Sequence, residues 1–290
     1  MLIRLAPWIF VVLWSTGFIG MRAAAPFIEP LTFLSIRFVL VVVILLIALP
    51  LFRIPLLPWR DAGRAMFVGA WLHGVYLGGV MFAIKHGMPA GVVALIISMQ
   101  PVLTTVCAGT VLGEEIRARH WLGLLLGVVG TSLVLLPRLE FTGWAFPPET
   151  IGAALVGLCG ITFATLYQKS RASHLDLRAS LLPQFAGAAV VTTILAFALE
   201  TREVIWSVEL VLALAWLVLV LSLGAISLLL FLLRENAVWR TSTLFYLIPP
   251  ATALFAWALF GEHLNIIQIG GMAVTMTAVF AVRPRPTPGT

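Results

Sequence analysis

The sequence predicts an all-α integral membrane protein with ten transmembrane helices, arranged as two inverted five-helix repeats with both termini in the cytoplasm. Three observations predict this fold: the scarcity of charge, the spacing of long apolar segments and an internal repeat. Of the 290 residues, 61% are hydrophobic and 10% are charged, and the mean hydropathy is +1.08. A soluble domain carries about 25% charged and about 45–50% apolar residues, so the composition excludes a soluble enzyme. It also excludes a disordered chain.

Ten segments are long and apolar enough to cross the bilayer, and only the second contains a charged residue, Arg37. A helix needs about 20 apolar residues to span the hydrocarbon core, whereas membrane strands are about 9–11 residues long. The first segment is longer and richer in aromatic residues than a signal peptide, so we interpret it as a retained span. The expected spans are approximately 5–21, 30–52, 65–84, 87–113, 121–137, 150–168, 179–199, 210–233, 241–261 and 264–282.

The basic residues indicate how these spans are oriented. With the N-terminus in the cytoplasm, 13 of the 18 Lys and Arg residues fall on the cytoplasmic side and four fall outside. This asymmetry follows the positive-inside rule. The net charge of +6 therefore reflects topology, and we expect no nucleic-acid partner. Both cysteines lie in expected spans without metal-ligand spacing, so we expect no disulfide, metal site or cofactor.

An internal repeat relates the two halves of the chain. The segment VVALIISMQPVLTTVCAGTVLGE at 92–114 corresponds to RTSTLFYLIPPATALFAWALFGE at 240–262 with a constant offset of 148. Pro101 then aligns with Pro249, and both segments end in Gly-Glu. A mid-span proline and a terminal Gly-Glu at the same separation indicate a duplicated unit.

We therefore expect two repeats, 1–140 and 149–285, each containing five spans. Because five is odd, the second repeat enters the membrane from the opposite side, and the repeats are inverted. Inverted repeats are typical of secondary transporters, whose binding sites lie near the bilayer midplane between the repeats.

The paired prolines, the Gly-Glu ends of the fourth and ninth spans, WSTGF at 14–18 and IRF at 36–38 resemble the drug/metabolite transporter superfamily. Over essentially its whole length, the chain is similar to proteins with two EamA-type repeats, and within that group to amino-acid exporters of the YddG type. The resemblance implies ten helices, with the third, fourth, eighth and ninth around a central cavity. It also implies efflux of small metabolites across the bacterial inner membrane. The Gly-Glu motif is specific to the family and says nothing about the cargo.

Prolines interrupt the fourth and ninth expected spans. Pro101 lacks an amide hydrogen, so we expect the carbonyl of Ile97 to lose its helical partner. Pro249 and Pro250 are expected to do the same to the carbonyls of Phe245 and Tyr246. These prolines are candidate kinks or hinges that present carbonyl groups to a substrate, and a purely structural kink is the alternative.

Polar side chains at mid-membrane depth are the candidate substrate-binding residues, because lipid offers them no partner. His73 is the only histidine expected inside a span, and Tyr76 shares its helix face. Gly74 and Gly78 are expected to let another helix approach. For His73 and Gln100 the alternative is a hydrogen bond within the bundle. The candidate set is His73, Tyr76, Ser98, Gln100, Ser242 and Tyr246.

Three charged residues are expected to act in gating or in structure. Arg37 lies about seven residues from the outer end of its span, where an arginine can snorkel to the interface. It can instead pair with Glu29 or Glu262. Glu114 and Glu262 each precede the next helix, so we interpret both as helix caps or gate latches.

These observations favour a secondary transporter that exports amino acids with aromatic and other neutral side chains by alternating access. No carboxylate lies deep in a span, which disfavours a cationic substrate or a carboxylate proton relay. The expected partners are a neutral or zwitterionic small molecule and the bilayer. Phosphorylated cargo needs basic residues in the cavity, and only Arg37 is available. The alternatives are transport of other metabolites or drugs in either direction, a channel and, least favoured, an enzyme, because no catalytic cluster is present.

Overall fold

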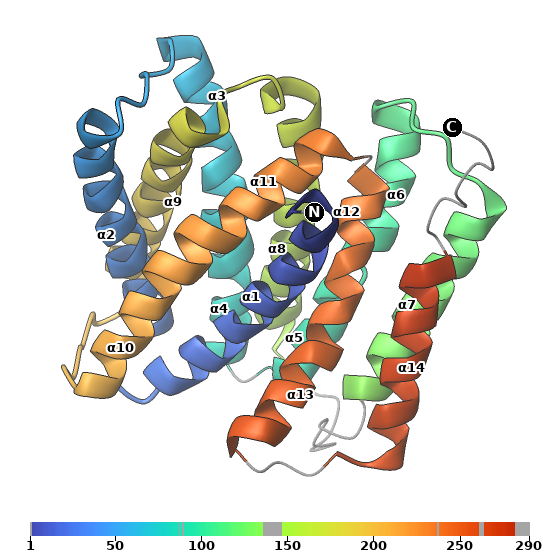
Figure 1. Ribbon diagram of the computed structural model, residues 1–290. Coiled ribbons are helices and arrows are strands. Elements are labelled where there is room, and N and C mark those ends of the chain that lie inside the picture. The colour runs from blue at the N-terminus through green and yellow to red at the C-terminus, as the bar shows by residue number, and fades with distance from the viewer. Residues whose placement is uncertain are drawn as a thin grey trace.

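The computed structural model describes residues 2–86, 88, 90–135, 147–236, 238–260 and 264–281. Over these residues the chain forms a bundle of helices without strands, and the only β-type pairing is an isolated bridge between Ile28 and Val204 (Figure 1). The elements are α1 (Leu2–Ala24), α2 (Pro30–Leu51), α3 (Trp59–Gly69), the π-helix η1 (Ala70–Val75), α4 (Tyr76–Lys85), α5 (Ala90–Ile97), α6 (Gln100–Val111), α7 (Ala118–Leu135), α8 (Pro148–Tyr167), the π-helix η3 (Gln168–Ala172), α9 (Leu177–Leu199), α10 (Val208–Trp216), the π-helix η4 (Leu217–Ala225), α11 (Ile226–Glu235), α12 (Val238–Thr243), the 3-10 helix η5 (Leu244–Leu247), α13 (Ile248–Phe260) and α14 (Ile266–Ala281).

Many of these helices have the length and composition of membrane spans. Large apolar side chains such as Ile47, Ile194 and Phe197 are exposed on the outside of the bundle, as lipid contact requires. Three further apolar helices are shorter: Leu5–Gly17, His120–Leu135 and Ile266–Val279. Within the described residues six helices are long and apolar enough to cross a membrane: Pro30–Leu51, Trp59–Lys85, Val92–Val111, Pro148–Ala172, Leu177–Leu199 and Val208–Glu235. The chain is therefore a helical integral membrane protein.

Two of these long helices have a π-helical segment in their middle, and a third, Pro148–Ala172, ends in the π-helix η3. The span Trp59–Lys85 consists of α3, η1 and α4, and the span Val208–Glu235 consists of α10, η4 and α11. A π-helix adds a residue to a turn, and such segments occur frequently at functional sites. Both η1 and η4 contribute to the cavity described below.

The helix of the fourth expected span is interrupted next to its proline. The helix α5 ends at Ile97, a turn follows, and α6 begins at Gln100, so Pro101 lies in the first turn of α6. The first amide groups of a helix have no intrahelical partner, and a proline there costs no hydrogen bond.

The ninth expected span is interrupted in a different way. The 3-10 helix η5 lies between α12 and α13, and Pro249 and Pro250 fall in the first turn of α13. The expectation that Pro249 leaves the carbonyl of Phe245 without a partner is wrong, because the amide of Ile248 donates to that carbonyl. The tighter 3-10 turn supplies a donor that an α-helix has lost at this point.

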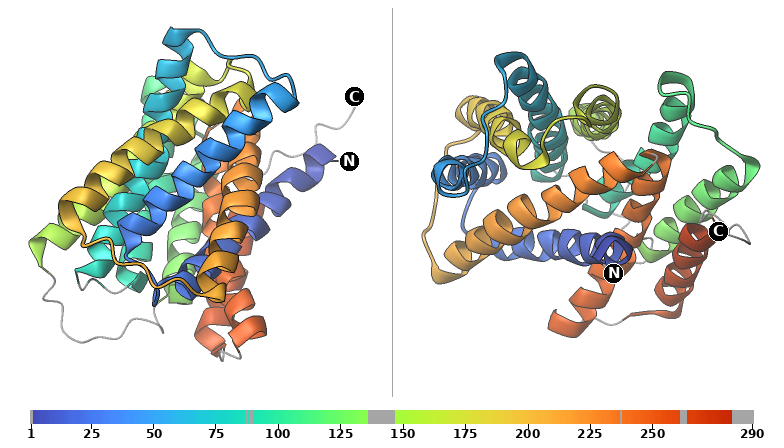
Figure 2. Two further views of the ribbon diagram at one scale, coloured as in Figure 1. Left: turned by 90° about the vertical axis from the view of Figure 1, so that its left-hand side faces the viewer. Right: turned by 45° about the horizontal axis from the view of Figure 1, so that its top comes forward.

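The bundle is built from close helix pairs. The helix α2 packs along α9, and α7 packs along α14 at one edge of the molecule (Figure 2). The expectation that Gly74 and Gly78 let another helix approach is confirmed, because the α9 side chains Val191 and Leu195 lie against them.

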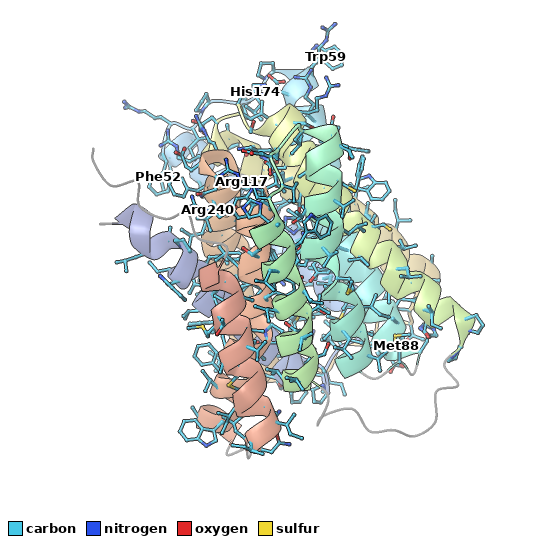
Figure 3. The ribbon with its side chains drawn as sticks, turned by 90° about the vertical axis from the view of Figure 1, so that its right-hand side faces the viewer. Phe52, Trp59, Met88, Arg117, His174 and Arg240 are labelled. Carbon is cyan, nitrogen blue, oxygen red and sulfur yellow. The ribbon has the colours of Figure 1, made fainter. Side chains whose placement is uncertain are left out.

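The described part of the chain begins and ends at the same end of the bundle. The helix α1 begins there and α14 ends there (Figure 1). The side chains of Trp59, Arg117 and Arg240 lie at this end, whereas Met88 lies at the opposite end (Figure 3). We call these the N-terminal end and the Met88 end of the bundle.

We predict that Gly69→Ala lowers the melting temperature of the purified protein. A Cβ atom at Gly69 would overlap the backbone carbonyl of Gln184 in α9, and backbone atoms cannot move aside as the tip of a side chain can. Overpacking of this kind costs about 1–3 kcal/mol.

The matched control lies on the same helix. A Cβ atom added at Gly63 would have no atom within 4 Å, so Gly63→Ala is expected to keep or slightly raise the melting temperature. Equal melting temperatures for the two variants would contradict the close packing of α3 against α9.

Candidate functional site

A partly open cavity lies between the first two helices and the two spans that contain η1 and η4. Its volume is about 560 Å³ when the solvent space at its mouth is included. The lining is mainly apolar, as is usual for sites that bind small molecules. The lining residues are Trp14, Gly17, Met21, Arg37, Leu72, His73, Tyr76, Leu77, Val80, Met81, Leu221 and Ile226.

The cavity lies towards the Met88 end of the bundle. The helix α1 and the span Trp59–Lys85 both run from the N-terminal end towards the Met88 end. The cavity residues of α1 and α4 lie in the second half of these two spans, which is the half nearer the Met88 end. Towards the N-terminal end, α6 packs against α12 and α8.

Arg37 is buried in the wall of this cavity, with 3% of its surface exposed. Its Nε donates a hydrogen bond of 3.0 Å to Oγ of Ser222 in η4, and its guanidinium carbon lies 5.4 Å from the ring centre of Phe38. Its Nη1 has no hydrogen-bond partner. The expectation that Arg37 snorkels to the interface is wrong, because the side chain is buried. It does not pair with Glu29, which binds Lys85 instead, and Glu262 lies outside the described residues.

His73 is held between two phenylalanine rings beside Arg37. Its ring stacks on Phe185 of α9, with centres 5.1 Å apart and planes 5° apart, and lies 5.8 Å from the ring of Phe38. Its Nε2 is buried without a hydrogen-bond partner. Tyr76 lines the same cavity from the first turn of α4. The expected pair of His73 and Tyr76 therefore shares one cavity.

Gln100 and Ser242 lie together at a second place in the bundle. The Nε2 of Gln100 donates to Oγ1 of Thr104 at 2.8 Å and contacts Oγ of Ser242 at 3.5 Å, so it joins α6 to α12. The Oε1 of Gln100 has no partner. The hydroxyl of Ser98, in the turn after α5, donates to the carbonyl of Leu95 in that helix. None of Gln100, Ser242 and Ser98 is among the residues that line the cavity.

Tyr246 occupies a third place. A Cβ atom at Gly127 in α7 would overlap its ring, so the ring packs directly on that helix. Its hydroxyl is buried without a partner. The six expected binding residues thus do not converge on one site.

Glu114 caps a helix that is distant in sequence. Its Oε1 accepts a hydrogen bond of 2.8 Å from the amide of Val238, at the start of α12. Lys169 caps the helix that precedes α12. Its Nζ donates to the carbonyls of Leu233, Arg234 and Asn236 at the end of α11, at 3.0, 3.2 and 2.9 Å. An acid at a helix start and a base at a helix end both complement the helix dipoles. We call this pair the α11–α12 clamp.

The sequence indicates only half of this clamp. It predicts Glu114 as a cap for the helix that follows it, whereas Glu114 caps α12. Lys169 carries no such signal, because its position after an apolar segment suggests only a topological role. The expectation that His73 is the only histidine within a helical span is also wrong, because His120 is buried in the first turn of α7 and stacks on Trp239.

Comparisons with known proteins agree with this architecture. Residues 5–136 match the EamA-like transporter family. The uncharacterized inner membrane transporter YedA of Escherichia coli K12 is 25% identical, over 93% of this chain and 87% of that protein. A Salmonella typhimurium protein named "Probable amino-acid metabolite efflux pump" is 25% identical, over 96% of this chain and 94% of that protein.

The family match and these names support membership of the drug/metabolite transporter superfamily. A solved crystal structure superposes on this transporter with a TM-score of 0.77 at 18% identity, covering 96% of this chain and 94% of that chain. At that identity the likeness concerns the fold alone. Within its described residues the transporter has no group of three or more His, Cys, Asp or Glu side chains that could hold a metal ion.

At the Met88 end, two carboxylates hold the loops of this transporter. Glu200 accepts hydrogen bonds from the amides of Leu31 and Thr32, at 2.8 and 2.7 Å, and so caps α2. Glu29 pairs with Lys85 at 2.8 Å and accepts from the amide of Arg202 at 2.6 Å. The sequence pattern does not indicate this network, although Pro30 marks a helix start that needs an acceptor for its first amides.

We predict that acid weakens this network through Glu29. The hydrogen bond from Lys85, with the bonds from Arg202 and Thr201, lowers the pKa of Glu29 from 4.5 to about 2, while desolvation opposes the shift. A carboxyl with a lowered folded-state pKa stabilises the fold above its ordinary pKa, and this contribution is lost as the pH falls through the folded value.

The measurement is the melting temperature in detergent at pH 6 and at pH 3. Between pH 6 and pH 3 the melting temperature of the wild type should fall more than that of Glu29→Gln, because the glutamine has no proton to gain. The control Glu209→Gln, at an exposed acid in the first turn of α10, should behave as the wild type does. A loss in Glu29→Gln as large as that of the wild type would contradict the role of Glu29.

Proposed function

We propose that this protein is a secondary transporter that exports amino acids with aromatic and other neutral side chains across the bacterial inner membrane by alternating access. The observation that carries the proposal is the cavity. It is mainly apolar, it contains the polar groups of Arg37, His73 and Tyr76, and the two halves of the chain line it together. Relatives named as an inner membrane transporter and as a probable amino-acid metabolite efflux pump support the choice of membrane and cargo.

The proposed architecture is ten spans in two inverted repeats, 1–140 and 149–285. A two-fold relation that exchanges the halves is supported by the packing, because α2 contacts α9 and α7 contacts α14, which are equivalent helices. The contact of α4 with α8 corresponds to that of η4 with α1, and the contact of α6 with α8 corresponds to that of α13 with α1. With the offset of 148, η1 at 70–75 falls on 218–223, inside η4.

The proposed orientation puts the N-terminal end of the bundle in the cytoplasm. Arg117 and Arg240 lie at that end (Figure 3), and the positive-inside rule assigns such groups to the cytoplasmic face. The cavity then lies in the outer half of the membrane, and the α11–α12 clamp lies on the cytoplasmic side. Alternating access requires the contact between Glu114 and α12 to open when the cavity turns inward. Pro101, Pro249 and Pro250 are the proposed hinges for this movement.

Transport by the purified protein in proteoliposomes tests the proposal. We predict counterflow of labelled phenylalanine, leucine or another neutral amino acid, and about tenfold weaker apparent affinity in His73→Ala, since one lost polar contact is worth about 1.4 kcal/mol.

The control for this variant is Cys159→Ala, at an exposed residue of α8, which should transport normally. The absence of counterflow for all twenty amino acids would refute the proposed cargo. Flux without saturation or trans-stimulation would indicate a channel instead.

The proposed role of the clamp makes a separate prediction. In Glu114→Ala the amide of Val238 loses its charged acceptor, and hydrogen bonds to charged groups contribute about 1.5–3 kcal/mol. Hydrogen exchange of a peptide covering residues 238–243 should therefore accelerate about tenfold or more.

Glu115 provides the matched control for this experiment. It is exposed and pairs with Arg117, so Glu115→Ala should leave exchange of residues 238–243 unchanged. If both variants exchanged at the wild-type rate, Glu114 would have no role in holding α12.

A further inference from the structure

We infer that Arg37 is the anchor for a carboxylate of the cargo, so that the cavity selects molecules with a carboxylate and rejects amines that lack one. This inference rests on the proposed transport function and specifies its substrate class. It assigns to Arg37 a direct contact with the cargo in place of the gating or structural role that its position in the sequence suggests.

The first argument is the unpaired charge of Arg37. Only 3% of the residue is exposed, and no described carboxylate forms an ion pair with it. A buried charge is costly unless it is paired, and the bond to Ser222 and the nearby ring of Phe38 offset only part of that cost. The fold therefore keeps an uncompensated cation in the wall of a cavity, where a ligand can complete its pairing.

The second argument is the geometry of the free donors. Ser222 occupies Nε, and Nη1 is buried without a partner, so the hydrogen-bonding capacity of the guanidinium is incomplete. Guanidinium groups match the two oxygens of a carboxylate better than any other side chain. The Nε2 of His73, whose ring also lies near Phe38, is a second buried and unpartnered group in the same wall.

The third argument is the charge of the remaining wall. None of the residues that line the cavity is acidic, so the lining carries one fixed positive charge and no counterion. An amine without a carboxylate is repelled by this charge. A zwitterion places its carboxylate at Arg37, and the aromatic faces of Trp14 and Tyr76 are available to its ammonium group.

Three molecules that share the same aromatic side chain and differ only in their charged groups test this inference in the wild-type protein. L-phenylalanine has both charged groups, 3-phenylpropionate lacks the amine, and phenethylamine lacks the carboxylate. The melting temperature of the detergent-purified protein should rise with L-phenylalanine and 3-phenylpropionate and remain unchanged with phenethylamine. The same trend is expected for L-leucine, 4-methylpentanoate and 3-methylbutylamine. Sodium chloride at the same concentration is the control for a generic anion.

Variants at Arg37 connect the selectivity to this residue. Arg37→Gln should weaken the apparent affinity for both carboxylates by about tenfold or more, because a charged pair is lost. Arg37→Lys keeps the charge without the planar fork and should fall between the wild type and Arg37→Gln. Size-exclusion chromatography shows which variants remain folded. If neither Arg37 variant folds, the ligand series on the wild-type protein still tests the inference.

Several outcomes would overturn the inference. They are equal stabilisation by phenethylamine, equal stabilisation by chloride, no stabilisation by any of the carboxylates, and undiminished carboxylate binding in folded Arg37→Gln. Failure of the transport proposal is separate. If the protein transports amino acids and phenethylamine inhibits this transport as strongly as 3-phenylpropionate does, the role of Arg37 as anchor is refuted and the proposed transport is not. Arg37-dependent binding of carboxylates without counterflow refutes the proposed cargo and leaves the anchor in place.

Discussion

Helix ends in this protein need partners from within the protein, since lipid cannot bond to the free amides and carbonyls that every helix end carries. The few charged side chains serve this purpose. Glu200 receives the first amides of α2, and Asp176 receives those of α9, from Arg178 and Ala179. Lys169 donates to the last carbonyls of α11. Glu200 and Lys169 come from segments distant in sequence, so these two caps also tie the helix end that they cap to another part of the bundle.

The spans follow from the sequence because bilayer thickness fixes their length. The expected segment 30–52 is α2 at Pro30–Leu51, and the expected segment 179–199 is α9 at Leu177–Leu199. The backbone beside the prolines does not follow in the same way. Whether Pro249 deprives a carbonyl of its donor depends on the choice between an α-turn and a 3-10 turn, and the apolar pattern is the same for both.

The site could be predicted from the sequence only where residues that lie together in space are also close in the sequence. His73 and Tyr76 are one turn apart, so their common cavity follows from helix geometry. The partner of Arg37 is Ser222, 185 residues away, and Glu114 caps a helix that begins 124 residues later. Contacts of this kind depend on tertiary packing, and no local spacing encodes them. Tyr246 shows the same limit, since its ring packs on α7.

The uncompensated guanidinium of Arg37 exposes the proposed cycle to the membrane potential. In alternating access, the potential falls mainly across whichever side of the cavity is closed. The fixed charge of Arg37 therefore crosses most of the electric field each time the cavity changes sides, even though the side chain itself stays in place. Each elementary charge that crosses gains about 2.3 kcal/mol per 100 mV. When the cytoplasm is negative, the membrane potential favours the inward-facing conformation of the empty carrier, in which an exporter binds its cargo.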